Sequence, residues 1–100
     1  MCNYYEIVCE ICEYFNEDSE LVISNSRKIK GRTSMIRGLC IYILREVLGA
    51  TNKQCRDLFH FKYVRDIQRL RSNIAFYVEC DEQYKKEYNL LKENKPHIFQ

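Results

Sequence analysis

The sequence predicts an all-α protein, a small helical bundle of about five helices. Apolar residues recur at three- and four-residue spacing along most of the chain, and no stretch alternates apolar and polar residues as a half-buried strand does. Only one proline and three glycines interrupt this pattern. With 100 residues, 46% of them hydrophobic, the chain suffices for one compact core. We therefore expect a single domain over residues 1–100, in which residues 79–100 form a C-terminal helix and tail.

In the first half of the chain, a helix is predicted over residues 4–15, because its apolar residues share one face and its glutamates lie on the other. Residues 16–19 break the pattern, and residues 21–23 then form a short turn that enters the core. After a basic loop, Ser34 is the expected N-cap of the central helix. The apolar stripe of that helix continues until Gly49, which ends it.

The second half begins with Thr-Asn-Lys-Gln at residues 51–54, the pattern of a capping box, so a short helix should start at Asn52. His60-Phe61 is the predicted turn, because a new apolar stripe begins directly after it. That stripe predicts a helix over residues 62–78 and thus a helix, a tight turn and a second helix. A last helix is predicted from Asp81 to Glu93.

Six cysteines would suggest a disulfide framework in a secreted chain, but the N-terminal sequence has no export signal. We expect an intracellular, cytoplasmic protein whose cysteines are mostly reduced core residues. Cys9 and Cys12 form one C-x-x-C, yet no second close pair completes four zinc ligands, so neither a metal nor a cofactor is expected. No apolar stretch is long enough to cross a bilayer, and no membrane partner is expected.

Positive charge is concentrated in the middle of the chain. From Arg27 to Arg71 there are 12 basic residues against three acidic ones, a local net charge of +9, while the two flanks together carry −7. Such a basic centre is typical of proteins that bind the phosphate backbone of nucleic acids. Within it, Lys53 stands at the start of a predicted helix, where the free backbone N–H groups would add to a phosphate contact.

The predicted helix over residues 62–78 carries polar side chains that suit base recognition once its apolar stripe faces inward. Arg65 and Arg69 are four residues apart and can pair with the edge of guanine, and Gln68 can pair with adenine in the major groove. The alternative is an ordinary solvated helix face, on which Asp66 occupies one of the arginines.

Several features occur together between about Ile7 and Arg71. The predicted first helix ends in EYF, a serine-rich basic loop reads SNSRK, Arg37 is followed eight residues later by Arg45-Glu46, and a capped polar helix ends in Phe59. In this combination the chain resembles the C-terminal DNA-binding domain of the bacterial replication initiator DnaA. The resemblance implies a helical bundle that contains a Trp-repressor-like helix-turn-helix.

The resemblance also implies roles for individual residues. In that family the basic loop enters the minor groove, which makes the loop at residues 27–32 the candidate here, and the arginine at the position of Arg37 contacts DNA. Taken with the residues considered above, the DNA-binding candidates are Arg27, Lys28, Lys30, Arg32, Arg37, Arg45, Lys53, Lys62, Tyr63, Arg65, Gln68 and Arg69.

The chain departs from the family at the turn, where it reads HFKYVRDI from His60 to Ile67 in place of Gly-Gly-Arg-Asp-His-Thr-Thr-Val. Recognition of the initiator's own target sequence is therefore not expected. No G-x-x-x-x-G-K-[ST] motif occurs, so the resemblance covers a stand-alone binding domain without an ATPase. Such domains suit phage or mobile-element proteins, plasmid initiators and small regulators.

The expected function is duplex DNA binding through the basic loop and the second helix of the pair, in replication or regulation. No arrangement of nucleophile, base or metal ligands is recognisable, so we do not expect an enzyme. Two alternatives stay open. The basic face can bind RNA, or it can dock an acidic protein partner in an interaction adaptor built on a helix-turn-helix scaffold, with tyrosines as anchors. These tyrosines are Tyr4, Tyr5, Tyr63, Tyr77 and Tyr88.

Overall fold

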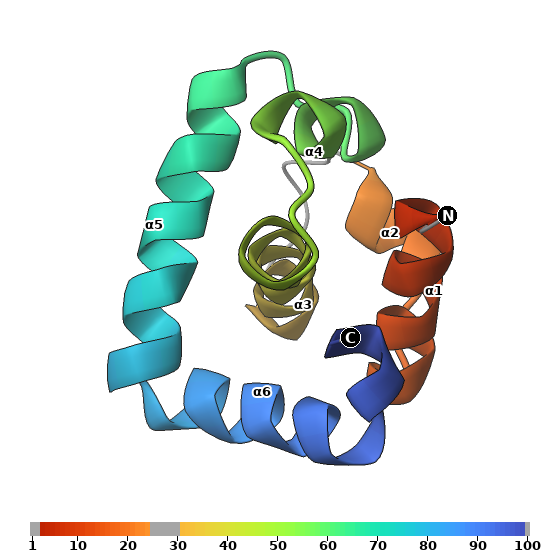
Figure 1. Cartoon of the computed structure of the whole chain (residues 1–100), viewed down its shortest axis with the longest axis vertical. Coiled ribbons are helices and arrows are strands. Elements are labelled where there is room, and N and C mark those ends of the chain that lie inside the picture. The colour runs from red at the N-terminus through yellow and green to blue at the C-terminus, as the bar shows by residue number, and fades with distance from the viewer. Residues whose placement is uncertain (1–2, 25–30, 100) are drawn as a thin grey trace.

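Helix α3 (Gly31–Tyr42) runs through the middle of the molecule, and the other helices surround it (Figure 1). The structure is a computed structural model that describes residues 3–24 and 31–99. Within these residues the chain forms six α-helices and no strand, which confirms the predicted all-α class. No helix in the described part is both long enough and apolar enough to cross a membrane.

The N-terminal helices cover one side of α3. Helix α1 (Tyr4–Phe15) has the predicted bounds: the Asn3 side chain accepts a hydrogen bond from the Glu6 amide at its start, and Asn16 in the left-handed conformation ends it. The segment predicted as a short turn is a five-residue helix, α2 (Ser19–Ile23), which Asp18 caps and which buries two of its apolar residues.

The start and the end of α3 differ from the prediction. The helix begins at Gly31, so Ser34 lies inside it and is not its N-cap. Glu17 contacts the first turn of this helix: it accepts a hydrogen bond from the Thr33 hydroxyl at 3.0 Å and lies 3.5 Å from the Arg32 side chain.

Beyond Tyr42 the central helix does not continue as an α-helix. A π-helical turn, η1 (Ile43–Val47), follows it, with a hydrogen bond from the Leu48 amide to the Ile43 carbonyl at 3.1 Å. Gly49 ends this turn as predicted, with a φ of +77°, and the next amide, that of Ala50, bonds back to Leu44.

Helices α4 (Asn52–Leu58) and α5 (Val64–Cys80) form the predicted helix, turn and helix. The capping box of α4 is present, because the Thr51 hydroxyl accepts from the Gln54 amide at 3.0 Å and the Gln54 side chain accepts from the Thr51 amide at 2.8 Å. The predicted start of the second helix at residue 62 is wrong by two residues.

Helix α6 (Glu82–Asn94) and a 3₁₀ turn, η2 (Pro96–Phe99), return the chain along the lower edge of the view to the side of α1 (Figure 1). Asp81 begins α6 by accepting hydrogen bonds from two backbone amides. The described cysteines are free thiols. Three of them belong to the core, Cys9 is partly buried and Cys80 is exposed; the three are Cys12, Cys40 and Cys55.

Candidate nucleic-acid interface

The turn between α4 and α5 depends on a left-handed residue. His60 has a φ of +60°, and the next amide, that of Phe61, donates to the Arg56 carbonyl at 2.9 Å. A φ in this region is uncommon for a non-glycine residue, although histidine is among those enriched there. Phe59, directly before the turn, is fully buried and anchors it to the core.

Lys62 and Tyr63 lie in the turn and not in the helix that follows. Tyr63 is extended, with a φ of −127° and a ψ of 143°, and its side chain forms no capping hydrogen bond with α5. Its ring, in a residue that is 44% exposed, has two cationic neighbours: the Lys62 ammonium at 5.3 Å and the Arg65 guanidinium carbon at 4.6 Å from its centre. An aromatic ring with two positive charges close to it thus precedes α5.

The exposed face of the first turns of α5 carries the remaining predicted base-reading residues. Arg65, Gln68 and Arg69 are all exposed. Arg69 pairs with Asp66 at 3.1 Å while its side chain remains 75% exposed. Of the two arginines, Arg69 is therefore the one that Asp66 occupies, as in the alternative of a solvated helix face. Arg65 has no carboxylate within ion-pair distance in the described part of the chain. Arg65, Asp66 and Arg69 border a shallow surface depression.

Arg37 extends from α3 to the same turn. Its guanidinium carbon lies 5.5 Å from the centre of the Phe61 ring, and its Nε and Nη1 atoms are buried without a hydrogen-bond partner. Burial lowers the pKa of Arg37, yet a guanidinium remains charged at any physiological pH. A half-buried positive charge without an acidic partner is therefore placed beside the turn.

Two other predicted residues form contacts within the protein. Arg32 lies over the Phe15 ring and near the carboxylates of Glu17 and Glu87, on the side of α1 and α6. Arg45 donates a hydrogen bond to the carbonyl oxygen of Ala50, in the link between η1 and α4. The geometry thus separates these two arginines from the set around Phe61 and Tyr63.

Lys53 is exposed in the first turn of α4 and has no acidic partner within ion-pair distance among the residues that the structure describes. Arg27, Lys28 and Lys30 of the predicted basic loop lie outside the described residues. One member of the interface is absent from the predicted set. Phe61 was assigned to the turn alone, although an aromatic residue next to a basic one signals a stacking surface.

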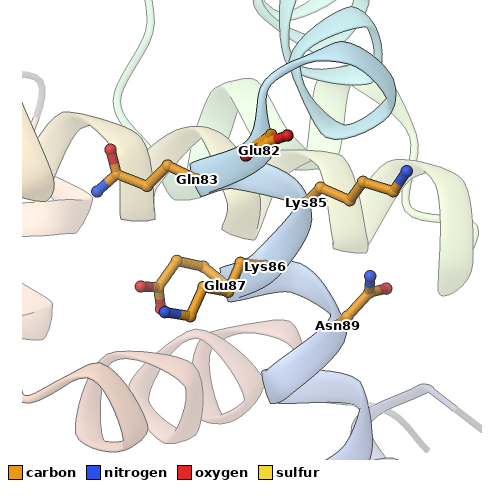
Figure 2. Close-up of a pocket in the computed structure, with 6 residues that line it drawn as sticks. All are labelled: Glu82, Gln83, Lys85, Lys86, Glu87 and Asn89. Atoms are coloured by element: carbon orange, nitrogen blue, oxygen red, sulfur yellow. The ribbon is translucent and has the colours of Figure 1, made fainter.

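The outer surface of α6 contains a second shallow hollow, which Figure 2 shows. All of its six lining side chains come from one helix, and they include acids and bases in equal numbers. They do not converge on a common point, so this surface has the features of a solvated helix face. In residues 3–24 and 31–99 no three His, Cys, Asp or Glu side chains are arranged to hold a metal ion.

No protein-family model, curated protein or solved structure matches this chain.

Proposed function

We propose that this chain is a duplex DNA-binding helix-turn-helix protein. The observation that carries the proposal is the set of unpaired cations around one turn. Arg37, Lys62 and Arg65 contact the rings of Phe61 and Tyr63, and none of the three has an acidic partner in the described structure. Cations without an acidic partner in the protein are available to an external anion, and a phosphate backbone supplies a row of anions.

The direction of α5 supports this function. Its first backbone N–H groups have no side-chain cap, and they point toward the side from which Lys62 and Tyr63 approach the helix. Phosphates bound there would orient the duplex, and the exposed face of Arg65, Gln68 and Arg69 would lie in the major groove. The resemblance to the DNA-binding domain of DnaA, in which a helix-turn-helix enters the major groove, points to the same placement.

The test begins with selection of duplexes from a random-sequence pool by the purified protein. Fluorescence anisotropy then compares an enriched duplex with a shuffled one from low to moderate salt. We expect binding that weakens steeply with salt, because counterions are released from the phosphates. Wild-type protein that leaves the anisotropy of both duplexes unchanged at low salt would disprove DNA binding.

Variants separate the two kinds of contact. Arg65→Ala or Arg69→Ala should weaken binding to the enriched duplex by ~1–3 kcal/mol and affect the shuffled duplex less. Lys53→Ala should weaken both duplexes equally and lower the salt slope by about one unit. Lys85→Ala is the matched control, because Lys85 is an equally exposed lysine on α6, away from the turn. Equal losses on both duplexes for every variant would exclude base recognition.

One observation favours a protein-interaction adaptor as the second candidate. Phe76 on α5 is 61% exposed, and the neighbouring Tyr77 is 40% exposed, so an apolar surface lies toward the C-terminal end of the helix. Solvent-exposed aromatic residues of this kind serve as anchors in protein interfaces. The adaptor predicts no response to duplex DNA, together with a protein partner whose recovery is lost in Phe76→Ser.

A further inference from the structure

Three basic residues near the start of α5 differ in how they are held. Arg69 is ion-paired with Asp66 on its own helix. Arg65 lies over the Tyr63 ring, with its guanidinium carbon 4.6 Å from the ring centre. Lys62 lies near the same ring, at 5.3 Å, but its ammonium is a compact charge on a flexible stem. Of the three, Arg65 alone has a planar hydrogen-bonding group whose neighbour is an aromatic ring, that of Tyr63, and not a carboxylate.

Stacking on a ring has a particular consequence for arginine. The contact uses the flat face of the guanidinium, whereas its five N–H donors lie in the plane and point away from the ring. An ion pair uses those donors. Arg65 has no carboxylate within ion-pair distance in the described residues, so its donors are available to another molecule. Arg69 must share its donors with Asp66 or exchange partners when it binds.

The Tyr63 side chain, which contacts Arg65, neither caps α5 nor packs in the core of the described structure. As the N-cap residue of α5 it makes no side-chain capping bond, and its ring remains partly exposed. Its extended backbone sets the ring beside the first turn of the helix, where Arg65 lies two residues further along.

We propose that Tyr63 is a positioning residue that holds Arg65 in the plane needed to read a guanine in the major groove. This inference rests on the proposed DNA-binding function. A bidentate contact with the O6 and N7 atoms of guanine requires a guanidinium of fixed plane, and an arginine already ordered in the free protein loses less side-chain freedom on binding. Lys62, as a mobile charge on the same ring, contacts phosphate and contributes no base preference.

The stacking itself is tested in the free protein. An aromatic ring shifts the NMR signals of groups that lie over its face, so the Arg65 δ-methylene and Nε–H signals should move toward random-coil positions in Tyr63→Leu. The signals of Arg69 serve as the internal control and should not move. Unchanged Arg65 signals in Tyr63→Leu would show that the pair does not exist in solution and would overturn the inference.

The consequence for recognition is tested with the duplex enriched from a random pool and with a shuffled duplex of the same composition. Tyr63→Leu should weaken the enriched duplex about threefold to tenfold and the shuffled one less than about twofold. Tyr63→Phe, which keeps the ring, should bind as the wild type does. The double variant Tyr63→Leu/Arg65→Ala should bind no more weakly than Arg65→Ala alone, because Tyr63 acts through Arg65.

The possible results separate this inference from the function on which it rests. If the losses from Tyr63→Leu and Arg65→Ala multiply in the double variant, Tyr63 acts independently and the inference fails, while DNA binding stands. If the selection enriches no sequence although the protein binds every duplex, the inference likewise fails while DNA binding stands. Wild-type protein that binds neither duplex at low salt overturns both the inference and the proposed function.

Discussion

Gly38 of α3 lies directly against the side chain of Ile74 on α5. A Cβ atom at Gly38 would come within 2.5 Å of the Ile74 Cδ1 atom and 2.9 Å of its Cγ1 atom, closer than such atoms can approach. The two helices therefore meet so closely at this position that any larger residue would force the Ile74 side chain or the helices to shift. This contact fixes α5, and with it the candidate recognition surface, against the centre of the fold.

Gly38→Ala should consequently destabilise the protein even though alanine favours helices. We expect the free energy of unfolding to fall by up to ~2 kcal/mol, because overpacking costs ~1–3 kcal/mol and the helix-propensity gain of about 1 kcal/mol offsets only part of that cost. Ile74→Val removes the clashing Cδ1 atom. It should cost ~0.5–1.5 kcal/mol alone and less than that in the Gly38→Ala background, where the nearer of the two close contacts is gone while Cγ1 remains. Additive losses in urea unfolding would contradict the close approach.

Arg37→Met should separate stability from binding. The variant keeps a long side chain against Phe61 and removes a half-buried charge that has no acidic partner, so the free energy of unfolding should stay equal or rise by up to ~1 kcal/mol. Affinity for duplex DNA should fall about tenfold, because a charged hydrogen-bond donor to phosphate is lost. Urea unfolding and anisotropy measure the two effects. A loss of stability without a loss of affinity would assign Arg37 to the fold alone.

Arg45→Met should lower the stability of the protein and leave its affinity for duplex DNA unchanged, the reverse of Arg37→Met. Arg45 donates to the carbonyl oxygen of the fully buried Ala50, and the methionine variant leaves that oxygen without this donor, at a cost of ~1–3 kcal/mol in unfolding free energy. Duplex affinity per folded molecule should not change. Arg45→Lys keeps a donor and is the control. If Arg45→Met binds DNA more weakly but has the same urea midpoint of unfolding as the wild type, the Arg45 side chain contacts DNA and does not stabilise the fold.

The cysteines should differ widely in their reactivity at pH 8. Burial raises the pKa of Cys55 to about 11, and a hydrogen bond with Cys12, together with burial, raises the pKa of Cys40 well above its ordinary value. Because the thiolate is the reactive form and a raised pKa suppresses it, Cys40 and Cys55 should react with iodoacetamide only after denaturation. The exposed Cys80 should react first. Peptide mass spectrometry after a brief exposure identifies the modified sites, and early labelling of Cys55 would contradict its burial.

The helices with clear local signals were predictable. The apolar stripe of α1 and the capping box at Thr51 depend on residues within a few positions of each other, and the structure confirms both. The contact of Glu17 with Thr33 in the first turn of α3 was not predictable, because the two residues are sixteen positions apart in the chain. The π-helical turn at Ile43–Val47 likewise left no sign in the apolar spacing.

The same distinction applies to the candidate interface. The positive charge of the middle of the chain was visible in the sequence, but which cations are paired within the protein was not. Arg32 and Arg45 have partners that only the tertiary structure brings near them, whereas Arg37 has none in the described chain. The stacking of Arg37 on Phe61 also joins residues that lie far apart in sequence.

The central position of α3 has a consequence for the exchange of its backbone amides with solvent. In the view of Figure 1 the other helices lie around α3. Most of its side chains between Met35 and Ile41 are buried. The amide protons of its buried part, from Met35 to Ile41, should therefore exchange only when the whole molecule unfolds, whereas those of α2 and η2 should exchange through local opening. Because Arg37 belongs to this helix, a ligand that engages it should slow exchange throughout the core rather than at the surface alone.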